Sequence, residues 1–182
     1  MSDSVLIVGG GIGGLAAAVA CTRAGLGVRL YEQAAAFSEV GAGVQLGPNA
    51  VRRLQGFGLG PALDAVVAQP ARLCVRNAVS GRELAALALN PDMAQRYGAP
   101  YFTIHRADLH GVLLGALAQD DRVSLRTACP VRAVRQDGGC VTLSLAADLE
   151  VQGDLLVGAD GLWSTVRQQV LGDGMAMPSG HV

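Results

Sequence analysis

The sequence predicts an α/β fold built on a parallel sheet of the nucleotide-binding type. Near the N-terminus an apolar strand runs into a glycine-rich turn and an Ala-rich helix, and a second strand ends in an acidic residue. A further strand followed by a helix lies near the C-terminus, with several strands between. This order fits a parallel sheet interrupted by a β insertion. Of the 182 residues, 51% are hydrophobic and 16% are charged, so the chain can bury the core of one domain.

The first three elements form a βαβ unit. Ser4–Val8 is a β-branched run that ends in glycines, which is typical of a buried strand. The Ala-rich segment Gly13–Ala24 predicts a helix that Gly25 ends, and Val28–Glu32 predicts the second strand. Together they span about 30 residues, the size expected of this motif.

The middle of the chain alternates short strands with helices. Gly41–Gly47 predicts a glycine-rich loop, and Pro48–Arg53 predicts a helix because proline fits the first helical position. Ala71–Leu89 contains two strand-like runs around a turn and predicts a hairpin. Tyr101–His105 predicts another strand, and Ala107–Ala118 predicts a helix with its Leu and Val side chains on one face.

The last third returns to the parallel sheet. Val123–Arg126 predicts a strand, and Val131–Arg135 and Cys140–Leu145 alternate around an Asp-Gly-Gly turn, so they predict a hairpin within a meander. Asp154–Gly158 predicts a strand, and Trp163–Val170 predicts the helix that follows it.

Composition argues against several classes of function. The net charge is −1 and no run of arginines occurs, so we expect no nucleic-acid partner. The four cysteines form no CxxC pair and His is scarce, so we expect no metal site, and free thiols in a reducing cytosol. The apolar stretch Ser4–Val28 is interrupted by glycines and is explained by a buried strand and helix, so we expect no membrane partner.

The glycine-rich turn gives the first indication of chemistry. Gly9, Gly11 and Gly14 match the pattern GxGxxG. The first glycine permits the tight turn, the second lets the backbone approach a pyrophosphate, and the third lets helix and strand pack closely. Ile12 and Gly13 belong to the helix N-terminus, whose free N–H groups attract a diphosphate. The alternative is a turn without a ligand, but the flanking strand and helix favour nucleotide binding.

Glu32 closes the second strand, 18 positions after Gly14. A carboxylate there can accept hydrogen bonds from both hydroxyls of an adenosine ribose and would repel a 2′-phosphate. The βαβ unit is therefore predicted to bind FAD or NAD rather than NADP. A solvated glutamate at a strand end is the alternative.

Three more segments carry a family resemblance. Glu39–Ala50, His105–Leu109 and Gly158–Arg167, the last with a DGxxSxVR pattern, follow GxGxxG in the order found in class A flavoprotein monooxygenases. The chain resembles the N-terminal half of these FAD-dependent aromatic hydroxylases, most closely salicylate hydroxylase and 3-hydroxybenzoate 6-hydroxylase. The resemblance implies a glutathione-reductase-like, Rossmann-type parallel sheet for FAD, a β-meander, and part of a β-rich substrate domain.

The resemblance also implies roles for single residues. The glycines of the turn and Glu32 hold the adenosine diphosphate half of FAD, and Val131 lines the adenine. Gln45 lies near the flavin, and Arg106 faces the pyrophosphate or ribityl chain, in keeping with a guanidinium placed before a helix N-terminus. Asp160 contacts FAD, partly through the structure that its motif organises.

The family is about twice as long as this chain, so a fragment is expected. Residues 1–70 and 104–172 are assigned to the FAD-binding domain, 71–103 to inserted strands of the substrate domain, and 173–182 to a tail leading to an absent half. The family's third fingerprint, a Gly-Asp followed by Ala and His, is missing, and Gly172-Asp173 does not match it. Catalytic residues are expected in the absent half.

The full-length protein is thus expected to be a cytoplasmic monooxygenase that uses FAD, NADH or NADPH, and O₂ to hydroxylate a phenolic or related aromatic substrate, with a homodimer left open. One alternative is a truncated, non-catalytic flavin-binding fragment. Another is an NAD-dependent dehydrogenase, which the DGxxSxVR match disfavours.

Overall fold

The computed structural model describes residues 4–38 and 41–180, without the side chain of residue 147. The chain divides into two compact units. The first is formed by Met1–Glu39 and Leu113–Val182, and the second by Val40–Val112.

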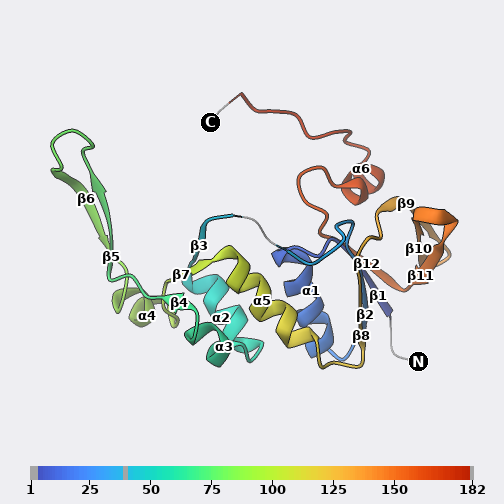
Figure 1. Cartoon of the computed structure of the whole chain (residues 1–182), viewed down its shortest axis with the longest axis horizontal. Helices are drawn as coiled ribbons and strands as arrows, with labels where there is room; N and C mark the ends of the chain where they lie inside the picture. Colours follow the sequence, from blue (N-terminus) through green and yellow to red (C-terminus); the bar gives the residue numbers. More distant parts are fainter. Residues whose placement is uncertain (1–3, 39–40, 181–182) are drawn as a thin grey trace. The chain divides into compact units, whose positions relative to one another are not determined.

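The first unit contains a four-stranded parallel sheet in the order β12-β1-β2-β8 (Figure 1). Its strands are β1 (Ser4–Val8), β2 (Gly27–Tyr31), β8 (Val123–Arg126) and β12 (Leu155–Gly158). Helix α1 (Ile12–Arg23) connects β1 to β2 and contacts both strands. Covered in this way, β1 is buried along nearly its whole length, as an apolar parallel strand should be. The predicted βαβ start is confirmed, with element ends within one residue of those expected.

A three-stranded antiparallel meander packs against this sheet. It consists of β9 (Val131–Asp137), β10 (Cys140–Leu145) and β11 (Glu150–Gly153). Leu143 and Leu145 of β10 share a buried cluster with Leu6 and Val8 of β1. The predicted hairpin is confirmed, and β11, which was not predicted as a strand, pairs with β10 and extends it.

Helix α6 (Thr165–Leu171) follows β12 and begins two residues later than the sequence predicted. Ser164 is its N-cap, and its hydroxyl accepts a hydrogen bond from the backbone N–H of Arg167 at 2.9 Å. A serine in this position satisfies a helical N–H that has no acceptor within the helix.

The second unit contains a small antiparallel sheet in the order β3-β7-β4. Its strands are β3 (Gly43–Leu46), β4 (Val67–Ala68) and β7 (Phe102–His105), and its helices are α2 (Pro48–Gly56), α3 (Gly60–Asp64) and α4 (Asp92–Tyr97). Helix α5 (Arg106–Leu117) begins in this unit and ends in the first. The prediction of a loop over 41–47 is wrong for residues 43–46. Pairing of Leu46 with the buried Phe102 stabilises a strand despite the flanking glycines.

A two-stranded ribbon, β5 (Arg72–Arg76) and β6 (Glu83–Ala88), confirms the predicted hairpin. Arg72 and Arg76 both lie 3.5 Å from the Glu83 carboxylate. Side chains alternate between the faces of a ribbon, so the pair Leu73 and Leu87 lies on the opposite face from Arg72. That apolar pair is about half exposed in this structure, at 47% and 53%.

Among the described residues, no helix is both long and apolar enough to cross a membrane. Within the same residues, no three His, Cys, Asp or Glu side chains gather as a metal site would require. All four cysteines are free thiols, and burial raises the pKa of Cys21.

Candidate cofactor-binding site

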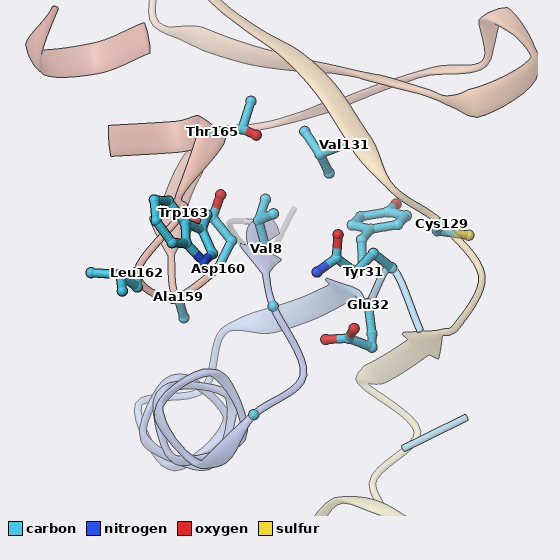
Figure 2. Close-up of a pocket in the computed structure, with 14 residues that line it drawn as sticks. Val8, Tyr31, Glu32, Cys129, Val131, Ala159, Asp160, Leu162, Trp163 and Thr165 are labelled. Atoms are coloured by element: carbon cyan, nitrogen blue, oxygen red, sulfur yellow. The ribbon is translucent and has the colours of Figure 1, made fainter. Parts of the chain in front are cut away.

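A cavity of about 380 Å³ lies at the carboxyl ends of β1, β2 and β12 (Figure 2). All of its lining residues belong to the first unit. They come from the end of β1 and the turn after it, the end of β2 and the residues that follow, the segment that leads into β9 with its first residue, and the loop after β12 with the first residue of α6. This edge is where open α/β sheets bind their ligands, because the loops diverge there and leave a crevice.

The glycine turn is packed so tightly that two of its positions cannot carry a side chain. Gly9 has φ +105°, and a Cβ on it would collide with the backbone of Ala159. A Cβ on Gly14 would collide with the carbonyl oxygen of Gly9. The first glycine therefore permits the turn and the third permits close packing of α1 on the strand end, the roles that the pattern assigns to them.

The start of α1 fits a diphosphate. Gly11 is the N-cap residue of α1 and lines the cavity. Because it has no side chain, it offers no side-chain acceptor to the N–H groups of the first turn of the helix. The N–H groups of the first turn, which includes Ile12 and Gly13, have no acceptor within the helix. A Cβ on Gly13 would meet nothing within 4 Å, so the space around this residue is open. These features match the chemistry of an anion-binding helix terminus.

Glu32 is held in place by the backbone around it. One carboxylate oxygen accepts the N–H of Gly10 at 2.6 Å, and the other accepts the N–H of Ala34 at 2.7 Å. A carboxylate offers about four acceptor positions, so it can still accept bonds from ribose hydroxyls. The bond to Gly10 ties this carboxylate directly to the glycine turn.

Asp160 uses both of its carboxylate oxygens within its own loop. One oxygen is bonded to the Ser164 hydroxyl, and the other accepts the N–H of Val166 at 3.1 Å. Gln168 and Arg167 also donate side-chain bonds to carbonyl groups of this loop. Asp160 therefore lines the cavity and also holds the loop that forms one of its walls.

Figure 2 shows Trp163 and Asp160 on one side of the cavity and Tyr31, Cys129 and Val131 on the other. Sequence reasoning did not assign Trp163 or Cys129. Trp163 lies inside the DGxxSxVR segment, which could have indicated it. Cys129 lies between two strands without any motif, and only the fold brings it to the cavity.

The structure thus brings together five of the predicted residues as lining of this cavity: Gly9, Gly11, Glu32, Val131 and Asp160. Ile12, Gly13 and Gly14 follow in the first turn of α1. Gln45, on β3, and Arg106, at the start of α5, belong to the second unit instead. The Arg106 backbone N–H donates to the carbonyl of Ala42 at 3.3 Å, which ties the start of α5 to the segment before β3.

Comparisons with known proteins give consistent results. The chain is 37% identical over 191 residues to 3-hydroxybenzoate 6-hydroxylase 1 of Aquipseudomonas alcaligenes, covering 100% of this chain and 46% of that protein. It is 40% identical over 169 residues to 3-amino-4-hydroxybenzoate 2-monooxygenase PtnB3 of Streptomyces platensis, covering 93% of the chain and 42% of the relative. The chain therefore spans less than half the length of these relatives.

Among solved structures, Klebsiella pneumoniae HpxO complexed with FAD and uric acid superposes with a TM-score of 0.82 at 29% identity. The alignment covers 93% of this chain and 42% of HpxO. The likeness confirms the predicted α/β class, a parallel sheet of the FAD-binding type with added antiparallel sheets.

The model of the FAD binding domain family matches residues 3–180, almost the whole chain. FAD is the cofactor of this family, and the glycine cradle and Glu32 fit its adenosine diphosphate half. This protein belongs to the FAD binding domain family.

Proposed function

We propose that this chain is the FAD-binding N-terminal portion of an NAD(P)H-dependent flavoprotein monooxygenase that hydroxylates a phenolic or related aromatic substrate. The observation that carries the proposal is the cavity where the GxGxxG turn, Glu32 and the Asp160 loop meet. The names of the two relatives, one acting on 3-hydroxybenzoate and the other on 3-amino-4-hydroxybenzoate, support the substrate class.

In the proposed complex the first unit binds the adenosine diphosphate half of FAD. Backbone N–H groups from Gly11 to Gly14 bind the diphosphate, and Glu32 binds the ribose hydroxyls. Val131 contacts the adenine. Asp160 acts mainly through the loop that it holds, because its carboxylate oxygens already accept bonds there.

The second unit would serve the flavin half. We propose that Arg106 faces the pyrophosphate or ribityl chain and that Gln45 lies beside the flavin. We also assign residues 71–103 to a substrate domain, residues 1–70 and 104–172 to the FAD-binding domain, and 173–182 to a connection that leads onward. The half-exposed apolar face of the β5–β6 ribbon supports the assignment of residues 71–103, since such a face is normally buried against another element.

Bound FAD would supply the oxygen-transfer chemistry, with NADH or NADPH and O₂ as co-substrates. The part of the protein described above binds and orients the cofactor. Groups that act on the substrate are proposed to lie in the part of the relatives that this chain does not span. A cytoplasmic location and a homodimer complete the proposal, the former supported by four cysteines that form no disulfide.

A second candidate is a flavin-binding fragment without catalytic activity. It is favoured by the coverage of only 46% of the hydroxybenzoate hydroxylase. NADH oxidation by the FAD-loaded chain, with and without 3-hydroxybenzoate, tests this candidate. Oxidation stimulated by the aromatic acid would rule out the inactive fragment. Its absence is expected of both candidates for this chain, because the groups that act on the substrate are proposed to lie in the part that the chain does not span.

The first test is retention of FAD by the purified chain after gel filtration. We expect the chain to keep flavin absorbance at about 450 nm. Glu32→Gln should weaken FAD binding about tenfold because it removes a charged acceptor for the ribose. The matched control is Glu150→Gln, since this glutamate is 49% exposed and pairs with Arg135 on the surface. A colourless wild-type protein, or equal losses in both variants, would contradict the proposed site.

A further inference from the structure

The β3-β7-β4 sheet of the second unit has one buried face and one polar face. Leu46, Phe102 and Ile104 are 7%, 1% and 3% exposed and form the buried face. Successive residues of a strand point to opposite faces, so Gln45 and Thr103, which are paired in the register, lie on the other one. This face bears hydrogen-bonding side chains rather than a core, as a ligand-facing surface would.

On this face the side chains of Gln45 and Tyr101 are joined directly. The Tyr101 hydroxyl donates to Oε1 of Gln45 at 2.5 Å. The amide group therefore has a fixed orientation, with its oxygen occupied and its nitrogen turned away from the phenol. In the described part of the chain, no acceptor is bonded to Nε2 of Gln45, so both of its N–H groups are available.

Tyr101 is itself held by the side chain of Asn90. The Tyr101 backbone N–H donates to Oδ1 of Asn90 at 3.0 Å, and Nδ2 of Asn90 donates back to the Tyr101 carbonyl at 2.7 Å. The same nitrogen also donates to the carbonyl of Pro70 at 3.1 Å. The Asn90 amide thus pairs with the Tyr101 backbone as a neighbouring strand would. This pairing fixes the backbone of the residue whose hydroxyl reaches Gln45.

We propose that Tyr101 is a positioning residue that holds the Gln45 amide with its N–H groups ready to bind an acceptor oxygen on a bound aromatic ring. The ligand chemistry is that of a flavin carbonyl or of a phenolate or carboxylate on the aromatic substrate. This inference deepens the proposed function and rests on it, because the proposed function sets Gln45 beside the flavin.

The physical reason is pre-organisation. A glutamine on an exposed strand samples many rotamers, and a ligand that binds it must order the side chain. The hydrogen bond from Tyr101 orders it before the ligand arrives, so less affinity is lost on binding. Tyr101 raises the affinity for the ligand only by ordering Gln45. A residue that merely stabilised the sheet would affect binding whether or not Gln45 was present.

The test is a double-mutant cycle in the 182-residue chain that combines Tyr101→Phe with Gln45→Ala. Tyr97→Phe is the matched control, because Tyr97 is 46% exposed and its hydroxyl makes no hydrogen bond within the described residues. The probes are FMN and 3-hydroxybenzoate, and ADP serves as a check on folding. Dissociation constants are measured together with the NMR signals of the Gln45 side-chain amide, assigned by their loss in Gln45→Ala.

We expect Tyr101→Phe to shift the Gln45 amide signals and to weaken binding of at least one probe about three- to tenfold. Tyr97→Phe should change neither, and ADP affinity should be equal in all variants. In the Gln45→Ala background, Tyr101→Phe should have no further effect. A loss for FMN alone identifies the flavin as the ligand, and a loss for 3-hydroxybenzoate alone identifies the substrate.

Two results would overturn the inference. One is an unchanged affinity for both probes in Tyr101→Phe, and the other is an equal loss in both Gln45 backgrounds, which would indicate a structural role. Failure of the proposed function is a different result: the wild-type chain does not retain FAD although FMN shifts the Gln45 signals. If neither probe shifts those signals in the wild-type chain, the inference is wrong even where FAD is retained.

Discussion

At the scale of single residues, two carboxylates of one cavity have different tasks. Glu32 accepts backbone N–H groups from Gly10 and Ala34 and so links the end of β2 to the glycine turn. Asp160 accepts from Ser164 and Val166 and holds the loop before α6. Their environments therefore predict different consequences of mutation: loss of Glu32 should act mainly on ligand binding, and loss of Asp160 mainly on stability.

Asp160→Ala should lower the free energy of unfolding by about 1–3 kcal/mol, because it leaves the Val166 N–H and the Ser164 hydroxyl without their acceptor in a partly buried site. Urea denaturation followed by circular dichroism measures the change. Asp121→Ala, at an exposed aspartate outside the cavity, is the control and should be close to neutral. Equal midpoints for the two variants would show that the loop is held by other contacts.

At the scale of elements, the exposed fraction of the leucine side chains distinguishes strands that contribute to the core from strands whose apolar side chains are half exposed. In β10, Leu143 is fully buried against the parallel sheet, whereas Leu73 of the β5–β6 ribbon is 47% exposed. A two-stranded ribbon alone is marginally stable in water, so its contribution to the stability of this chain should be small.

The same substitution in the two strands should therefore have unequal effects. Leu143→Ala should cost about 2–5 kcal/mol, because it opens a cavity in the core. Leu73→Ala should stay within about 0.5 kcal/mol of the wild type, because about half of the side chain is already exposed to water. Thermal or urea unfolding of both variants measures the difference. A large loss for Leu73→Ala would mean that the ribbon face is covered in solution.

At the scale of the whole molecule, the cavity lies entirely within the first unit. The adenosine diphosphate half of the cofactor should therefore bind without help from the second unit. Gln45 and Arg106, the residues that we propose for the flavin half, belong to the second unit. The two halves of the ligand should consequently stabilise the chain differently.

ADP at about 100 times its dissociation constant should raise the free energy of unfolding of the unit that binds it by about 2.7 kcal/mol. Thermal unfolding at several ADP concentrations checks this, with a rising midpoint as the expected result. Glu32→Gln should need more ADP for the same shift, whereas Tyr101→Phe should match the wild type. A midpoint that does not respond to ADP would contradict nucleotide binding in the first unit.

Local patterns explain how much of the fold could be predicted. The βαβ start, the ribbon and the β9–β10 hairpin have strong alternation, turn residues or a glycine motif, and the structure confirms them. Strand β3 was not predicted, because its flanking glycines favour a loop and its partner β7 is distant in sequence. Strand β11 was not predicted either, and only its pairing with β10 identifies it. The short helices α3 and α4 were missed, since each has too few residues for a helical period to be visible.

The sequence by itself determined the parallel α/β class and the family. The GxGxxG spacing in the sequence also predicted the two positions that cannot carry a side chain: Gly9, with its positive φ, and Gly14, where a Cβ would collide with the Gly9 carbonyl oxygen. Only the tertiary structure decided that five predicted residues line one cavity, that Asp160 uses its oxygens within its own loop, and that Tyr101 holds Gln45. The reason is physical: a turn or a helix start is set by neighbours in sequence, whereas a hydrogen bond across 56 residues depends on how the chain folds back on itself.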